Sequence, residues 1–363
     1  MTSGLSSPRL RAGRGLAIVA ALQLGWGVAC AAPAGASHVQ TNAFTFVDLP
    51  GPAAAVSFET PAARPLAALP AGVQAFHGIP FLIRDRLAVT GMEAARRGQF
   101  HPTELNAIPV GLKAKRLHLL HAAYGDEKDG VPMAMLVFHY AGGAEESARL
   151  GYGIHSRNWE ITRAEKKNGL ADPNSQVAWA EGGNDGRGPD FRLFQSALEN
   201  PRPDEVITSL DVVSLFSQAA PFIAAISAET GDSGLAPNRP MTSRKIVREM
   251  NELGDSTYRR ELAVRVTDAA GGGPLTNATV ALEVTDDEES FFFGEVRADA
   301  QGICRLPYPP QQTVAFKLLV RAPNRIPQVL SEAKASRAGL GREFKASLQR
   351  GVAIGGEIGR AHV

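Results

Sequence analysis

Cysteine is scarce in this chain, which has 363 residues and only two cysteines, Cys30 and Cys304. Two cysteines cannot build the disulfide framework of a small secreted scaffold, and no Cys pair has the spacing of a zinc site. If Cys30 is removed during export, Cys304 has no partner, and its neighbour Ile303 indicates a thiol buried as a small hydrophobic side chain. An exported protein without disulfides is more typical of bacteria.

An excess of charge of either sign is also lacking. The formal net charge is +1, so the sequence has no basic excess of the kind expected of a nucleic-acid-binding protein. Catalytic motifs are missing as well, because there is no G-x-S-x-G, no H-E-x-x-H helix, no P-loop and no dinucleotide fingerprint. We therefore predict a chain that is not an enzyme, that has no nucleic-acid partner and that needs no organic cofactor.

The apolar run near the N-terminus, residues 16–24, is too short to favour a membrane-spanning helix. It follows Arg9, Arg11 and Arg14 and leads into Ala-rich sequence. Basic, apolar and small residues in this order are typical of a secretory signal peptide, which we place at residues 1–36. We predict a protein that is secreted or located in the cell envelope, without a transmembrane span.

Cys30 leaves a second fate for this segment open. The four residues ending at Cys30 half resemble a lipoprotein cleavage box, although Gly27 stands where that box usually has leucine. The alternatives are a lipid anchor at Cys30 and an ordinary residue that is removed with the signal.

Regular alternation of apolar and polar residues is what the chain does have, most clearly over residues 261–307. Leu262, Val264 and Val266 alternate with polar neighbours, and a Gly/Pro turn cluster follows at residues 271–274. Alternation then resumes over residues 279–284. Short alternating runs separated by turn residues predict a small antiparallel β-sandwich.

This segment resembles the carboxypeptidase regulatory-like domain, a transthyretin-like sandwich. The matching pieces are residues 266–268, 274–280 and 298–302, whereas residues 311–312 and 322–324 depart from the family pattern. The resemblance implies the fold and no activity, because such domains accompany many enzymes and surface proteins.

The preceding half of the chain is also rich in strand patterns, including apolar runs at residues 78–83 and 221–227 and a hairpin turn at residues 141–144. It resembles a galactose-binding-like, jelly-roll module of secreted bacterial proteins. The pieces that carry this resemblance are residues 79–81, 113–122, 140–143 and 199–203. Related sandwiches bind glycans on exposed loops, so the resemblance implies a possible carbohydrate ligand.

We therefore predict an all-β chain in five segments. They are a signal peptide (1–36), a jelly-roll-like β-sandwich (40–229), a linker with a short helix (230–257), a smaller carboxypeptidase regulatory-like sandwich (258–350) and the truncated start of a further module (351–363). Ile246, Met250 and Leu253 recur at helical spacing and predict the helix over residues 242–253. The last residues resemble an in-frame translation of a sequencing adapter, and the alternative is a genuine polar tail.

A ligand site is predicted around Trp159, which lies in a loop-like stretch and could stack on the face of a sugar ring. Asn158, Arg157 and Arg192 would supply polar contacts. Trp179 instead follows strand alternation and is expected in the core.

A structural Ca²⁺ is the one metal for which the sequence offers ligands. The loop at residues 181–190 contains Asn184, Asp185 and Asp190 among flexible glycines, and oxygen ligands suit this ion. The alternative is a solvated hairpin tip. His118 and His121 do not predict a zinc site, because residues three apart on a strand point to opposite faces.

These features predict an exported, non-catalytic surface or secreted protein that binds a partner or mediates adhesion, with a glycan or another cell-surface component as the partner. One alternative is the accessory N-terminal part of a larger secreted hydrolase or peptidase. The other is a structural spacer.

Overall fold

The structure is a computed structural model. It describes residues 40–41, 43–49, 71–84, 86–99, 101–161, 169–182, 190–241, 255–287, 289–333 and 343–351. All described residues belong to one compact unit, within Ala36–Val363. The predicted signal peptide, Cys30, the helix expected over 242–253 and the residues after 351 lie outside the described part of the chain.

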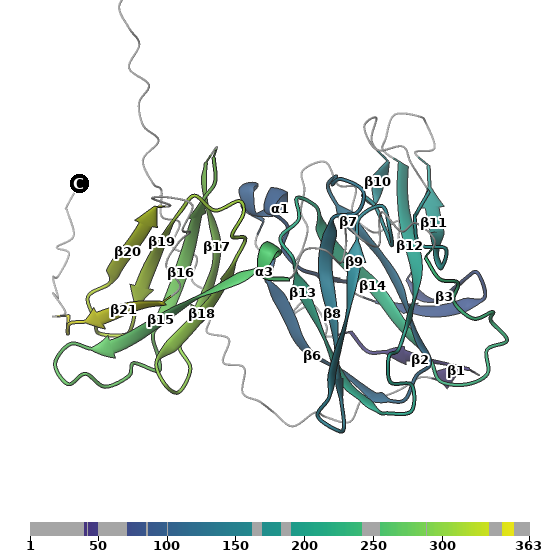
Figure 1. The fold of residues 1–363 in the computed structure, drawn as a ribbon, viewed down its shortest axis with the longest axis horizontal. Helices are drawn as coiled ribbons and strands as arrows, with labels where there is room; N and C mark the ends of the chain where they lie inside the picture. Colours follow the sequence, from purple (N-terminus) through teal and green to yellow (C-terminus); the bar gives the residue numbers. More distant parts are fainter. Residues whose placement is uncertain are drawn as a thin grey trace, which may run out of the picture. The chain divides into compact units, whose positions relative to one another are not determined.

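The first half of the described chain folds into two facing antiparallel sheets (Figure 1). One sheet has the strand order β1-β2-β14-β7-β12-β10, with β5 paired to β14 and β11 to β12, and the other has the order β6-β13-β8-β9. The strands of the first sheet are β1 (Gln40–Thr41), β2 (Phe44–Val47), β5 (Leu87–Ala88), β7 (Arg116–Tyr124), β10 (Glu160–Ile161), β11 (Ser175–Glu181), β12 (Asp190–Glu199) and β14 (Ala220–Glu229). Those of the second are β6 (Glu104–Leu112), β8 (Pro132–Tyr140), β9 (Glu145–Gly151) and β13 (Ile207–Ser214).

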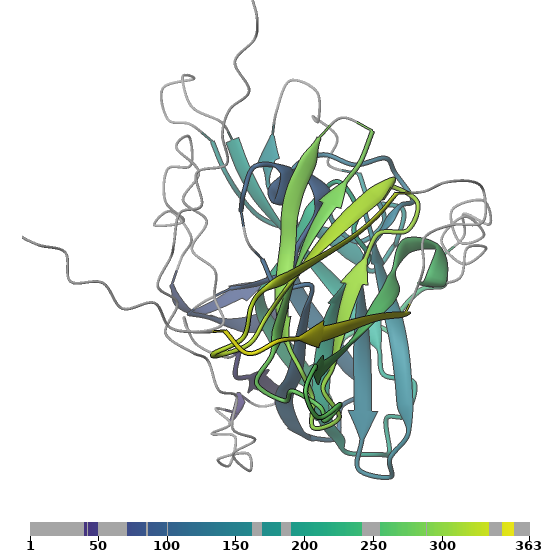
Figure 2. The same cartoon turned by 90° about the vertical axis from the view of Figure 1, so that its left-hand side faces the viewer.

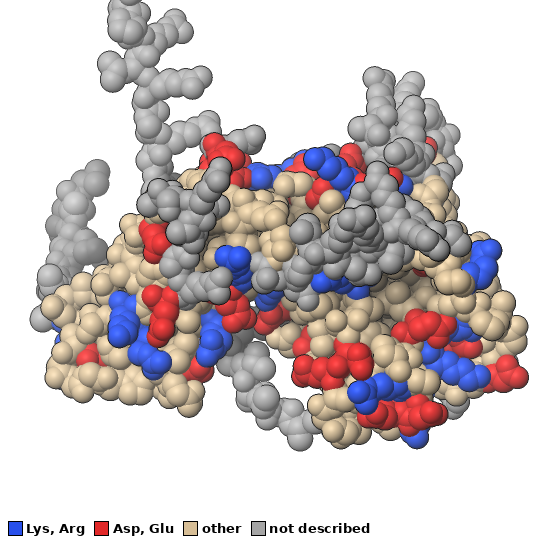
Figure 3. All heavy atoms as spheres, viewed as in Figure 1, with Lys and Arg blue, Asp and Glu red and all other residues tan. Residues whose placement is uncertain are grey.

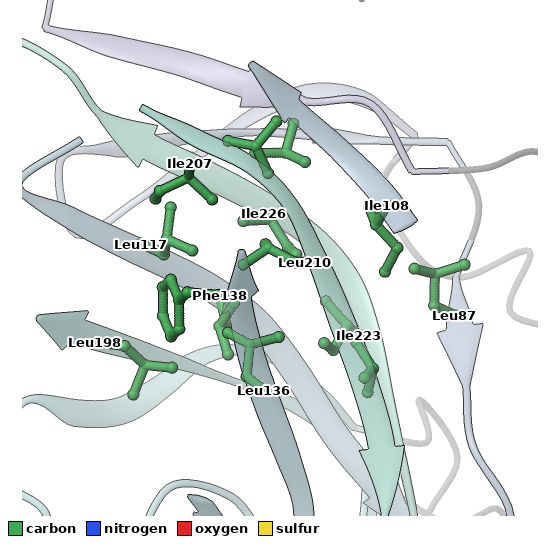
Figure 4. Packing of buried hydrophobic residues seen from close by; sticks show 14 of the residues in the cluster. Leu87, Ile108, Leu117, Leu136, Phe138, Leu198, Ile207, Leu210, Ile223 and Ile226 are labelled. Carbon is green, nitrogen blue, oxygen red and sulfur yellow. The ribbon is translucent and has the colours of Figure 1, made fainter. Parts of the chain in front are cut away.

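Alternate residues of these strands form the core between the two sheets. Leu117 of β7 and Phe138 of β8 lie in the space between the sheets together with Leu210 of β13 (Figure 4). All three side chains are fully buried. Inward-facing apolar residues from both sheets are the arrangement that a sandwich requires.

A third layer covers the other face of the larger sheet. This layer is the hairpin of β3 (Gly72–Phe76) and β4 (Ile79–Ile83), whose Phe81 is buried in one cluster with Leu120 of β7 and Phe222 of β14. Every residue of β14 is consequently buried. Because both faces of this strand are covered, apolar side chains are needed on both. The sequence of residues 221–227 is therefore almost continuously apolar and does not alternate.

The strands after residue 259 form a second, smaller pair of sheets, seen from another direction in Figure 2 (green to yellow). The orders are β18-β15-β21 and β17-β16-β19-β20, and β15 and β21 are the one parallel pair among the described strands. The strands are β15 (Arg260–Asp268), β16 (Thr279–Thr285), β17 (Ser290–Arg297), β18 (Ile303–Tyr308), β19 (Ala315–Arg321), β20 (Gln328–Ala333) and β21 (Glu343–Leu348).

Cys304 of β18 lies in the core between these sheets, as its sequence neighbour indicated. Burial raises the pKa of its thiol to about 12. The side chain is therefore an uncharged, packed group, because the thiolate that would react is strongly disfavoured.

Helices are few and short in the described residues: α1 (Met92–Arg96) and α3 (Asp255–Tyr258). No described helix is both long and apolar enough to cross a membrane. The all-β prediction, with sandwiches built mainly of antiparallel strands, is confirmed. The five segment boundaries stay predictions.

Candidate functional site

The four residues predicted to form a ligand site lie together at one end of the first sandwich. The segment carrying Arg157 and Trp159 runs parallel to the end of β7, where Ala123 N donates to Arg157 O at 3.0 Å and Trp159 N donates to Ala123 O at 2.8 Å. The segment then enters β10, where Arg192 N donates to Trp159 O at 2.7 Å. Backbone pairing with β7 and β12 thus fixes this segment.

Arg157 is 3% exposed and faces a neighbouring loop. Its guanidinium donates from Nη1 to Asp129 Oδ1 at 2.7 Å and from Nη2 to Asp129 Oδ2 at 3.0 Å. Nε donates to the carbonyl oxygen of Gly169 at 2.9 Å. Two parallel hydrogen bonds between a guanidinium and a carboxylate fix both the position and the orientation of the carboxylate. Arg157 therefore anchors the loop of residues 125–131, which carries Asp129.

Asn158 anchors the same loop at a second point. Its Nδ2 donates to Asp126 Oδ1 at 2.7 Å, while its Oδ1 accepts from the backbone N–H of Glu160 at 3.2 Å. The hydroxyl of Tyr152 accepts from Asn158 N at 3.2 Å. The amide group is therefore engaged within the protein at both its oxygen and its nitrogen.

Trp159, which sequence reasoning placed in a loop-like stretch as a candidate for sugar stacking, lies inside the protein. Its side chain is 7% exposed, and its ring centroid lies 4.3 Å from that of Phe191 and 5.7 Å from that of Tyr124. Trp179, which was expected in the core, is only partly buried against it. Sugar stacking by Trp159 stays a prediction, and in this structure its ring is part of the core.

Arg192 is fully buried on β12. Its Nε donates to the carbonyl oxygen of Asn158 at 2.9 Å, and its guanidinium carbon lies 5.2 Å from the centroid of Phe194. All four predicted residues are thus brought together, and each of the contacts described here is made within the protein.

The loop that these residues hold is what faces solvent. Asp126, Lys128 and Asp129 are exposed. Glu127 ties the loop to the neighbouring β13–β14 connection, because its Oε2 accepts from the backbone N–H of Gln218 at 2.7 Å. Sequence reasoning did not reveal how this loop is held, because its support comes from residues about 30 and 90 positions away.

The predicted Ca²⁺ ligands lie mostly outside the described residues. Asp190 is exposed at the start of β12, while Asn184 and Asp185 fall in the undescribed segment 183–189. Within the part of the chain that the structure describes, no group of three His, Cys, Asp or Glu side chains is placed to hold a metal. The Ca²⁺ site stays a prediction.

His118 and His121 have different partners on different sides of β7. His118 Nε2 lies 3.2 Å from Glu229 Oε2, and His121 Nε2 lies 2.8 Å from Ser196 Oγ. Burial lowers the pKa of His121 to about 3, so this ring is neutral near pH 7.

Ser196 and His121 belong to a buried polar chain that the sequence did not reveal. Ser175 Oγ lies 2.8 Å from Ser196 Oγ and 2.5 Å from Asp172 Oδ2, and Ser196 also reaches the carbonyl oxygen of His155 at 3.0 Å. The residue types suggest a hydrolytic site. Ser196 is fully buried, however, so its hydroxyl has no access to a substrate and joins β7, β11 and β12 instead.

A surface hollow lies elsewhere, beside β2 and β4. It encloses a volume of only about 10 Å³ and is lined by Val47, Asp48, Leu49, Leu82 and Arg84. Pockets that enclose small-molecule ligands usually measure about 300–1,000 Å³. This hollow is below that range.

Charges of both signs are mixed on the surface. On the face shown in Figure 3, lysine and arginine side chains alternate with aspartate and glutamate side chains, and neither sign forms a continuous stripe. This distribution agrees with the net charge of +1 and gives a polyanion no electrostatic track on that face.

No family model and no curated protein matches the chain. Among solved structures, it is distantly similar to the pilus 2b backbone protein of group B streptococcus, with 11% identity and a TM-score of 0.21 over 74% of this chain and 91% of that chain. It is also similar to the Bacillus anthracis TIE protein, with 10% identity and a TM-score of 0.20 over 68% of this chain and 52% of that one. TM-scores this low carry no argument about function.

Proposed function

We propose that the chain is an exported, non-catalytic module of a bacterial surface or secreted protein, and that it mediates adhesion through the loop of residues 125–131. The observation that carries this proposal is the anchoring of an exposed loop by two buried side chains, Arg157 and Asn158. A loop held in one conformation loses little entropy on binding, which is how rigid scaffolds present recognition loops.

The chemistry of the exposed side chains favours a glycan as the partner. The exposed carboxylates of Asp126 and Asp129 already accept from Asn158 and Arg157, and in this proposal the remaining lone pairs of their oxygens accept from sugar hydroxyls. Lys128 between them offers an ammonium donor. In this proposal Arg157, Asn158 and Arg192 position the loop and do not touch the ligand. Trp159 supports them from the core.

Binding of the full chain to a glycan array tests the proposal. We expect defined glycans to be retained by the wild type and lost in Lys128→Ala. Asp48→Ala, which removes an exposed carboxylate far from this loop in the sequence, serves as the matched control and should bind as the wild type does. An array on which Lys128→Ala and the wild type bind the same glycans equally would refute the assignment of the loop.

Export is supported by the order of basic, apolar and small residues at the N-terminus. Whether Cys30 carries a lipid is decided by metabolic labelling with a fatty-acid analogue. Incorporation that disappears in Cys30→Ser supports the anchor, and a labelled Cys30→Ser variant would argue against it.

A structural spacer is the second candidate, and it is favoured by the packed contact between the two sandwiches described below. Tandem sandwiches in the coding sequence after residue 351, together with an empty glycan array, would support it. The third candidate, an accessory part of a larger secreted hydrolase or peptidase, requires a catalytic domain in that same downstream sequence.

A further inference from the structure

Three side chains of the first sandwich are built into the core of the second. Met92 and Ala95 of α1 and Phe216 of the β13–β14 connection are buried in one cluster with Leu282, Phe293 and the other core residues of the second sandwich. Helix α1 lies between β5 and β6 in the chain, so it belongs to the first sandwich by sequence. It contacts β17 of the second.

Phe216 has an unusual backbone for an aromatic residue, with a φ of 56°. The cost of this left-handed conformation is offset by two hydrogen bonds: Phe216 N donates to Ser214 Oγ at 3.0 Å, and Phe216 O accepts from Gln312 Nε2 at 3.3 Å. Gln312 belongs to the second sandwich. The Phe216 side chain is buried with the core of the second sandwich, although the residue belongs to the β13–β14 connection of the first.

The strand of the second sandwich that contacts the Phe216 ring also has an irregular backbone. The register of β16 against β17 shifts between Leu282 and Glu283, which leaves Phe293 as an extra residue in β17. The Phe293 ring lies 4.9 Å from the Phe216 ring, centroid to centroid. A β-bulge redirects a side chain in this way, so both partners have special backbone at the contact.

A partly buried ion pair also links the two sandwiches, and the guanidinium carbon of Arg96 lies 6.0 Å from the Phe291 ring centroid. Arg96 of α1 donates to Asp286 Oδ2 from Nε at 2.9 Å and from Nη2 at 2.6 Å, and its Nη1 donates to Gln218 at 2.7 Å. Asp286 is buried. Asp286 Oδ1 also accepts from Glu289 N at 3.0 Å within the second sandwich, and Arg96 is the cation that links this carboxylate to the first sandwich. Separating the two sandwiches would leave the buried carboxylate without this counter-charge, which favours the arrangement that keeps the pair.

Arg259, directly before β15, extends the same contact. Its side chain donates to the carbonyl oxygen of Thr103 at 3.1 Å and pairs with Glu104 of β6. Its guanidinium carbon lies 5.4 Å from the Phe216 ring centroid. The first residue beyond α3 is thus fixed to the first sandwich.

The start of the predicted linker is also hydrogen-bonded to the first sandwich. Arg116 donates to the carbonyl oxygen of Ala236 at 2.7 Å, Asn238 donates to that of Ala197 at 2.7 Å, and Arg239 N donates to Asn174 Oδ1 at 2.8 Å. Residues 230–241 therefore follow the first sandwich.

From these contacts we infer that the two sandwiches form one rigid body. The Phe216 side chain, buried in the core of the second sandwich, holds the two together, and the Arg96–Asp286 ion pair sets their relative orientation. The inference is independent of what the loop of residues 125–131 binds. It predicts one narrow distribution of distances between the sandwiches and one cooperative unfolding transition.

Double electron–electron resonance on the full chain tests the inference. Spin labels are attached at Gln176→Cys and Val329→Cys, which replace exposed residues of β11 and β20, in a Cys30→Ser background. Cys304 is buried and escapes the label. We expect a single narrow distance peak for the labelled protein.

Arg96→Glu and Phe216→Ala should each broaden this peak and split the calorimetric transition in two. Combining Arg96→Glu with Asp286→Arg should restore the narrow peak, since the pair is re-formed with its signs exchanged. Arg97→Glu is the matched control, because this exposed neighbour pairs with Glu93 of the same sandwich. A broad peak in the otherwise unmutated protein, or a peak that neither Arg96→Glu nor Phe216→Ala changes, would overturn the inference.

Discussion

Arg116 and Glu229 form a two-point ion pair inside the first sandwich, with Nε 2.6 Å from Oε2 and Nη2 3.0 Å from Oε1. Their side chains are 8% and 3% exposed. The pair joins β7 to the end of β14 and, through Ser233, holds the first residues after that strand.

Removing one member of this pair should destabilise the protein strongly. Arg116→Met leaves Glu229 as a buried charge without its guanidinium, which typically costs about 3–5 kcal/mol. The measurement is the free energy of unfolding in urea. As a control, Arg84→Met breaks the Arg84–Asp48 pair, whose side chains are 60% and 50% exposed, and should cost about 0–1 kcal/mol. Equal losses in the two variants would contradict this view of the buried pair.

The stability of the protein should fall as the pH is lowered from 7 toward 4. Burial lowers the pKa of His121 to about 3 and that of His101 to about 4, both from 6.5. In the unfolded chain these rings take up protons below about pH 6.5, so protons favour unfolding there. Glu229, whose pKa falls from 4.5 to about 2, adds a loss below about pH 4.5 in the same direction.

Urea midpoints measured between pH 8 and pH 4 test this dependence. His121→Gln, which keeps a polar group beside Ser196, should flatten the decline between pH 7 and pH 5. His139 provides a contrast, because its hydrogen bond to Asp211 raises its pKa. Its contribution to folding stability is therefore fully present below about pH 6.5 and is lost as the pH rises further. A His121→Gln curve that parallels the wild-type curve would show that this ring does not carry the effect.

Trp159→Ala should destabilise the fold rather than remove a ligand contact alone. The ring packs against Phe191, and large-to-small changes of this kind in a core cost about 3–5 kcal/mol. Trp159→Phe, which keeps an aromatic ring, should cost much less. Unfolding curves of both variants measure the difference, and a Trp159→Ala protein as stable as the wild type would place the ring outside the core.

Arg157→Lys should loosen the loop of residues 125–131 while leaving the sandwich folded. Lysine keeps the charge and cannot form the two-point pair with Asp129. Hydrogen exchange followed by mass spectrometry should show faster exchange in peptides from this loop and unchanged exchange in β14. Arg202→Lys is a suitable control, because Arg202 pairs with Glu146 and Glu205 at the surface. Unchanged exchange in the loop of Arg157→Lys would mean that other contacts hold it.

Much of the fold could be predicted because strand patterns are local. The alternation of Leu262, Val264 and Val266 marks β15, and the apolar run before Ser227 marks β14. Other elements gave no usable local signal. Helix α1 has five residues and no capping side chain, which is too short to produce a helical period. Strand β17 contains a bulge, so its alternation is interrupted at Phe293.

The ligand site around Arg157, Asn158, Trp159 and Arg192 stays a prediction. The structure shows that these four residues lie together, with side chains buried in the protein. The direction in which they point could not be predicted, because it depends on a parallel bridge between Ala123 and Asn158, 35 residues apart. The packing of Phe216 against the second sandwich was not predicted either, because its partners Phe293 and Gln312 come much later in the chain.

Titration of a glycan identified on the array against the full chain tests the proposed function most directly. We predict saturable binding by the wild type, a Kd at least tenfold weaker in Lys128→Ala, equivalent to about 1.4 kcal/mol, and an unchanged Kd in Asp48→Ala. Unfolding curves of all three proteins should coincide within about 0.5 kcal/mol. A wild-type chain that binds no glycan, or a Lys128→Ala variant that binds as tightly as the wild type, would contradict adhesion through this loop.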